Sequence, residues 1–174
     1  MNIYKYLAVF LSIVVAVIFQ PTFFAKLGLP GATPDLVLVV VACWAITKGP
    51  AVGIVAGFLA GFLIDVAPPG NHLMGIASII LALLGYVIGI IGSGQSRSIL
   101  RPLLVSSMAA TSFFVFRTIW AIFAGNSISL EIFSLNFLTQ GLYAAVLAIF
   151  VYPGITYLDR KLGPLSRSDE LRMQ

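Results

Sequence analysis

Few side chains in this sequence could take part in catalysis, and they form no recognised set. The chain has one cysteine, Cys43, and one histidine, His72. A single cysteine cannot form an internal disulfide, and this pair cannot build a metal site unless carboxylates supply most of the ligands. The sequence contains no glycine-rich phosphate loop, no Ser/His/Asp arrangement and no H-E-x-x-H motif. We therefore expect neither enzymatic activity nor a cofactor.

Asp65 and Arg117 are charged residues that fall within long apolar stretches. At about 1.5 Å per helical residue, Asp65 lies roughly 22 Å from Pro50, and Arg117 lies roughly 21 Å from Leu103. Charged side chains inside a membrane usually face protein or water and find partners. One interpretation is an intramembrane charge pair between Asp65 and Arg117. The other is that each reaches the outer interface separately, Arg117 by extending its long side chain toward water.

The composition indicates the environment of these residues. Of 174 residues, 60% are hydrophobic and only 9% are charged, whereas soluble domains carry about 25% charged residues. The net charge is +4, but the positions of the basic residues favour membrane orientation over nucleic-acid binding. We expect a protein embedded in a lipid bilayer, with no nucleic acid as partner.

Six apolar stretches predict helices that cross a membrane. A span needs about 20 mostly apolar residues to cross about 30 Å of hydrocarbon. These runs are continuously apolar, which is not the alternating pattern of a transmembrane β-strand. The sequence therefore predicts an all-α integral membrane bundle of six transmembrane helices over residues 1–156, with a basic cytoplasmic tail at 157–174. The predicted spans are residues 6–24, 34–47, 51–66, 73–91, 101–124 and 135–155.

The first three spans are defined by their lengths and by the residues that flank them. Lys48, Gly49 and Pro50 alone separate the second span from the third, and a merged helix would be about 50 Å long, so a helical hairpin is expected. The first span is longer than a signal-peptide core and no small-residue cleavage site follows it. We therefore expect it to be a retained helix.

Basic residues predict the orientation. Short cytoplasmic loops carry an excess of Lys and Arg. With the N-terminus inside, only Lys26 falls on the outer side. Both termini are therefore predicted to be cytoplasmic. The basic residues that fall inside are Lys5, Lys48, Arg97, Arg101, Arg160, Lys161, Arg167 and Arg172.

Small residues recur at four-residue spacing in several spans, including Gly85 and Gly89 in the fourth. The third span has Gly53, Gly57 and Gly61, and the first has Ala8, Ser12 and Ala16. Small residues let helix backbones approach closely inside a membrane. Internal packing of the bundle is the main interpretation of the glycine stripe. The stripe of the first helix could instead be a docking face for a helix of a partner protein.

An ordered set of residues runs through the second and third spans: Pro34, Asp35, Leu36, Gly53, Gly57, Phe58, Gly61 and Asp65. This set resembles the MreD family of rod-shape-determining proteins. That family has a P-D-L-hydrophobic entry to the second helix and a G-x-x-x-G-F-x-x-G-hydrophobic-hydrophobic-x-D run in the third. The similarity is clearest over about residues 30–92, and the rest of the chain agrees in hydropathy.

The resemblance implies a non-catalytic component of the bacterial cell-elongation machinery, which builds peptidoglycan at the inner membrane. Members of the family partner MreC, a bitopic protein with a periplasmic domain. They also act with the actin-like MreB, the RodA glycosyltransferase and a class B penicillin-binding transpeptidase.

The same resemblance supplies an alternative. The MreD family is similar in fold to the six-helix substrate-binding subunits of energy-coupling-factor vitamin transporters, although fold alone does not determine function. Those subunits hold a vitamin in a polar outer pocket and use small residues of the first helix to contact the coupling subunit. The expected outer loops of this chain offer few polar groups for such a pocket, among them Asn71 and His72.

Overall fold

The computed structural model describes residues 3–23, 33–67, 75–92, 100–123, 125 and 130–161. Every regular element within these residues is an α-helix, which confirms the predicted all-α bundle. His72 and the tail beyond residue 161 lie outside the described residues. The helices are α1 (Ile3–Phe23), α2 (Leu36–Lys48), α3 (Pro50–Val66), α4 (Ile76–Gly92), α5 (Leu100–Phe123) and α6 (Leu130–Lys161).

The helices differ in length. Within the described residues, α1, α5 and α6 are long and apolar enough to cross a membrane, whereas α2, α3 and α4 are shorter apolar helices. Large apolar side chains cover the outside of the bundle, for example Leu11, Met108 and Phe150. Lipid tails accept such a surface, whereas water does not. The chain is therefore a multi-pass membrane protein.

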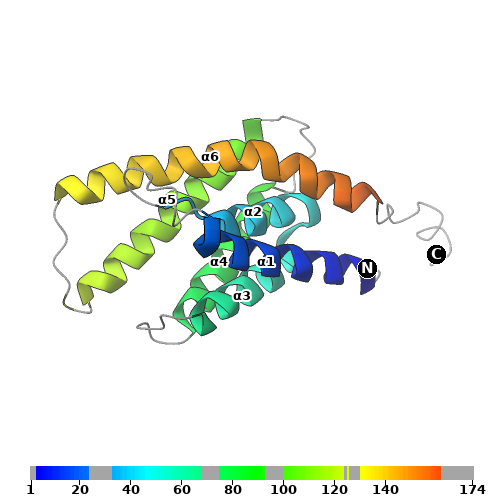
Figure 1. The fold of residues 1–174 in the computed structure, drawn as a ribbon, viewed down its shortest axis with the longest axis horizontal. Coiled ribbons are helices and arrows are strands. Elements are labelled where there is room, and N and C mark those ends of the chain that lie inside the picture. The colour runs from blue at the N-terminus through cyan, green and yellow to red at the C-terminus, as the bar shows by residue number, and fades with distance from the viewer. Residues whose placement is uncertain are drawn as a thin grey trace.

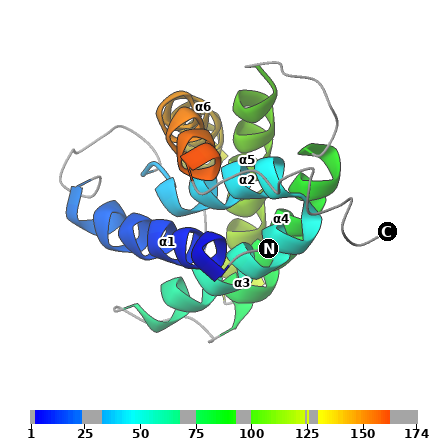
Figure 2. The same cartoon turned by 90° about the vertical axis from the view of Figure 1, so that its right-hand side faces the viewer.

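Helix α2 forms the centre of the bundle (Figures 1 and 2). It packs against all five other helices, and its residues 37–45 are all buried. A helix that is hydrophobic on every side is expected to be enclosed. With 13 residues, α2 is roughly 20 Å long, so it is shorter than the bilayer core but is surrounded by protein.

The ends of α2 follow directly from local sequence. Asp35 caps its N-terminus, because the carboxylate accepts a hydrogen bond from the Leu38 backbone N–H at 3.2 Å. Gly49 ends the helix with φ at +86°, a conformation that favours glycine. Pro50 then occupies the first turn of α3, where its missing N–H leaves no hydrogen bond broken. The expected hairpin between the second and third spans is therefore present.

Helix α6 is longer than the predicted span. It begins at Leu130 and continues to Lys161, so residues 157–161 of the predicted tail are helical. Arg160 and Lys161 lie in the last turn, where basic side chains interact favourably with the helix dipole. Hydropathy marks where a helix stops being apolar, and this helix continues past that point.

Candidate functional site

The glycine stripe of α3 lies against α4. A Cβ atom added to Gly53 would lie 2.7 Å from the Gly85 carbonyl carbon, and one added to Gly57 would lie 2.5 Å from the Leu81 carbonyl carbon. A Cβ atom on Gly61 would lie 2.5 Å from the Ser78 backbone nitrogen. The two backbones are therefore in direct contact over about two helical turns.

Asp65 closes the hairpin between these helices. Its Oδ2 atom accepts hydrogen bonds from the backbone N–H groups of Gly75 and Ser78, at 3.0 and 3.2 Å, and from the Ser78 hydroxyl at 2.9 Å. These backbone groups lie at the start of α4, where the first N–H groups of a helix have no partner within the helix. Asp65 thus caps α4 from the end of α3.

The structure does not bring Asp65 and Arg117 together. Asp65 is engaged with the start of α4, whereas Arg117 lies on α5 and lines a pocket beside Asp35. The ion pairs among the described residues do not include either of them. The similar depth of the two residues along their helices did not specify their direction around the helix axis, so two separate roles replace the predicted charge pair.

The small-residue stripe of α1 faces the inside of the bundle. Ala16 is buried, and the Ser12 hydroxyl accepts a hydrogen bond from the Trp44 indole N–H at 2.8 Å. The same hydroxyl donates to the Val9 carbonyl. Ala8 is partly buried against the core. In this chain the stripe of Ala8, Ser12 and Ala16 therefore packs toward α2.

A charge cluster occupies the end of the bundle where α1 begins and α6 ends (Figure 1). The Asp159 carboxylate of α6 pairs with Lys48 of α2 and lies 4.0 Å from the Lys5 ammonium of α1. Lys5 is only 4% exposed. One carboxylate thus joins three helices and neutralises part of the charge of two lysines.

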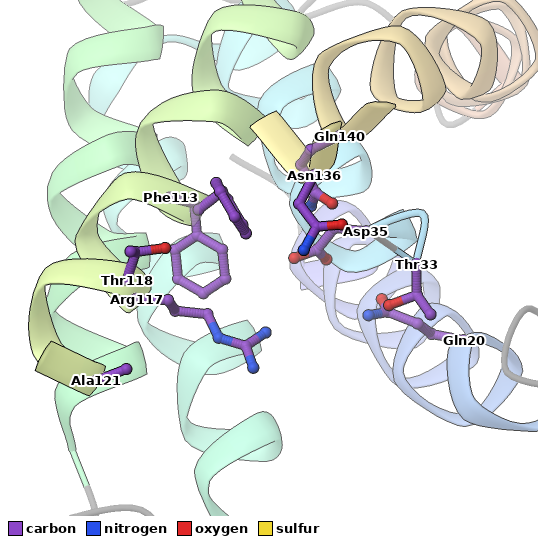
Figure 3. Close-up of a pocket in the computed structure, with 10 residues that line it drawn as sticks. Gln20, Thr33, Asp35, Phe113, Arg117, Thr118, Ala121, Asn136 and Gln140 are labelled. Atoms are coloured by element: carbon purple, nitrogen blue, oxygen red, sulfur yellow. The ribbon is translucent and has the colours of Figure 1, made fainter. Parts of the chain in front are cut away.

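A polar pocket lies at the opposite end of the bundle, where residues of α1, α5 and α6 meet the segment before α2. Figure 3 shows the residues that line it. Its volume is about 310 Å³. Arg117 extends from α5 toward the wall that carries Gln20 and Asp35 (Figure 3). The remaining polar side chains in its lining are Thr33, Thr118, Asn136 and Gln140, and its apolar lining comes mainly from Phe113 and Phe114.

Asp35 stands in the P-D-L pattern directly before an apolar helix, a position that signals an N-cap. Gln20, which also contacts the start of α2, could not be predicted from a local signal because it lies on another helix. The Gln20 side-chain carbonyl accepts a hydrogen bond from the Val37 N–H at 3.1 Å, so α1 also helps to cap α2.

The comparison with protein families matches nearly the whole chain. The model of one family, described as rod shape-determining protein MreD, matches residues 1–162. No curated protein and no solved structure matches the chain. The matched range includes all six helices, the glycine contact, Asp65 and the pocket. The chain therefore belongs to the rod shape-determining protein MreD family.

Proposed function

We propose that this chain is a non-catalytic membrane scaffold of the bacterial cell-elongation machinery and that it acts through an MreC-like bitopic partner. The observation that carries the proposal is the family match over residues 1–162, since the family implies a role in rod-shape determination. The machinery would place the chain indirectly with MreB, a RodA-type glycosyltransferase and a class B penicillin-binding transpeptidase. Its location would be the inner membrane.

The architecture supports a scaffold. The described residues lie almost entirely in helices that pack against one another, and large apolar side chains face outward along α1, α5 and α6. Such faces offer a surface for the transmembrane helix of a bitopic partner. Because the small-residue stripe of α1 packs inward, we place the partner contact on the outward face that includes Leu7, Leu11 and Ile18.

A photo-crosslinking scan tests the partnership. A photoreactive residue at Leu11 or Ile18 should form an adduct with the MreC-like protein in living cells. The same residue at Ala16, which is buried, is the matched control and should give none. A chain that supports growth as rods but gives no such adduct from any outward position would exclude direct contact with that partner.

The orientation is part of the same proposal. One end of the described bundle carries four basic residues, and we place this end in the cytoplasm. The four residues are Lys5, Lys48, Arg160 and Lys161. The native Cys43 is buried, and Cys43→Ser gives a background without other thiols. On that background, a membrane-impermeant thiol reagent should label Asn71→Cys from outside intact cells and should not label Gln174→Cys. The reverse pattern would invert the topology.

The polar pocket favours a second candidate function. The pocket is lined by polar side chains of the kind that a vitamin site needs, whereas the outer loops expected from the sequence offer few of them. These side chains are Gln20, Asp35, Arg117, Asn136 and Gln140. This observation supports a ligand-binding subunit of a vitamin-type transporter. A screen of the purified protein for a copurified vitamin discriminates between the two functions, because the scaffold proposal requires none.

A further inference from the structure

The pocket at the N-terminal end of α2 has opposite charges on opposite walls. Asp35 is 6% exposed, and its carboxylate is held by the Leu38 N–H and by the Gln20 side chain. Arg117 faces it from α5 on the other side of the pocket (Figure 3). The described residues form no ion pair with Arg117. The cavity of about 310 Å³ therefore keeps the two charges apart.

Two buried polar side chains in the pocket wall have no partner among the described residues. The other threonines within the described helices, such as Thr111 and Thr156, donate their hydroxyls to the carbonyl four residues earlier. Thr118 makes no such bond, although it is only 8% exposed. Gln140 is 7% exposed and likewise has no hydrogen bond from its amide to the described residues. Both side chains line the pocket, so a polar occupant can satisfy the hydrogen bonds that they leave unused.

The two walls define the charge of that occupant. An anion bound to Arg117 alone would be repelled by Asp35, and a cation bound to Asp35 alone would be repelled by Arg117. A group that carries both charges satisfies both walls. Guanidinium groups bind carboxylates and phosphates through paired N–H donors, and a carboxylate accepts hydrogen bonds from an ammonium group.

We propose that this pocket binds a small zwitterionic group, with its carboxylate or phosphodiester on Arg117 and its primary ammonium toward Asp35. Thr118 and Gln140 donate or accept the remaining hydrogen bonds. Two sources share this chemistry: the head group of an ethanolamine phospholipid that enters from the bilayer, and a free α-amino acid that enters from water. The proposal does not depend on the role in cell shape, because it concerns binding to the isolated chain.

The purified full chain provides the test, with two arms that distinguish the sources. In detergent, the probes are sn-glycero-3-phosphoethanolamine and a set of α-amino acids, and the readout is the thermal unfolding midpoint. In nanodiscs, phosphatidylethanolamine competes with phosphatidylglycerol, and native mass spectrometry reads the lipid that remains on the protein. We expect saturable binding of one zwitterion. Binding of an α-amino acid in detergent identifies a source in water, whereas binding of sn-glycero-3-phosphoethanolamine together with retention of phosphatidylethanolamine in nanodiscs identifies the lipid.

The variants locate the binding. Arg117→Gln should weaken the binding by about tenfold or more, because a charge-assisted hydrogen bond is lost. Arg160→Gln is the matched control at an exposed position of α6 and should leave binding unchanged. Thr118→Val retains the cap of α2 and should weaken binding without lowering the stability of the free protein. Asp35→Asn should also weaken binding, and Thr118→Val keeps the test decisive if Asp35→Asn fails to fold.

Three results would overturn the proposal. The first is the absence of saturable binding in both arms. The second is equal binding to wild type and to the Arg117→Gln and Thr118→Val variants. The third is that ethanolamine or glycerol 3-phosphate, which carry one kind of charge only, stabilises the protein as much as the zwitterion does.

Discussion

Substitution of Gly57 by alanine should destabilise the bundle, because no space exists for a Cβ atom. That atom would lie 2.5 Å from the Leu81 carbonyl carbon and 2.9 Å from the Ala82 Cα atom, whereas ordinary contact begins at 3.4 Å. Helix α4 would have to move away by about 1 Å. Overpacking costs about 1–3 kcal/mol, and the higher helix propensity of alanine offsets about 0.5–1 kcal/mol of it. We expect a net loss of about 1–2 kcal/mol.

Thermal unfolding of the purified protein in detergent measures this loss. For a chain of this size, a loss of about 1–2 kcal/mol corresponds to a midpoint lower by about 2–8 °C. Gly57→Leu should lose more while still inserting into the membrane. Gly154→Ala is the matched control, since nothing lies within 4 Å of its added Cβ atom, and it should be neutral or slightly stabilising. Wild-type stability of both Gly57 variants would refute the backbone contact between α3 and α4.

The remaining predictions concern the charged residues, and each uses the same unfolding measurement. Asp65→Ala should lose about 1–2 kcal/mol, since α4 loses its cap; wild-type stability would contradict the capping role. The losses of stability caused by Asp65→Ala and Arg117→Gln should add in the double variant, because the two residues occupy separate sites. A double variant that recovers part of the loss would instead support the charge pair. Asp159→Asn should lose about 1–3 kcal/mol, which is less than for a fully buried ion pair because the Asp159 side chain is 25% exposed. Adding Lys48→Met should recover part of that loss, and no recovery would contradict the pairing.

The helices could be predicted because lipid requires long apolar helices, and such runs are visible in any sequence. Their ends were less predictable. Helix α6 begins five residues before the predicted span and ends at Lys161, because charged residues can extend a helix beyond the apolar run. Helix α2 is bounded by Asp35 and Gly49, which are local signals for the start and the end of a helix.

The partners of individual side chains could not be predicted in the same way. Hydropathy and spacing place a residue on a helix, but they do not say which helix lies opposite. The spacing of Ala8, Ser12 and Ala16 marked a face that is small, and only the structure places Trp44 against Ser12. Asp65 has its partners ten to thirteen residues further along the chain, so depth along the helix was the wrong guide. The pocket combines residues of three helices and of the segment before α2, and no local pattern contains it.

Depletion of the chain in a rod-shaped bacterium without a paralogue tests the central claim most directly. Fluorescent labelling of new peptidoglycan and measurement of cell length and width would follow the loss of the protein. We expect cells that become round, with wall synthesis displaced from the cylinder, and re-expression of the wild-type chain should restore rods. Cells that remain normal rods after complete depletion, with an unchanged pattern of wall synthesis, would contradict the proposed function.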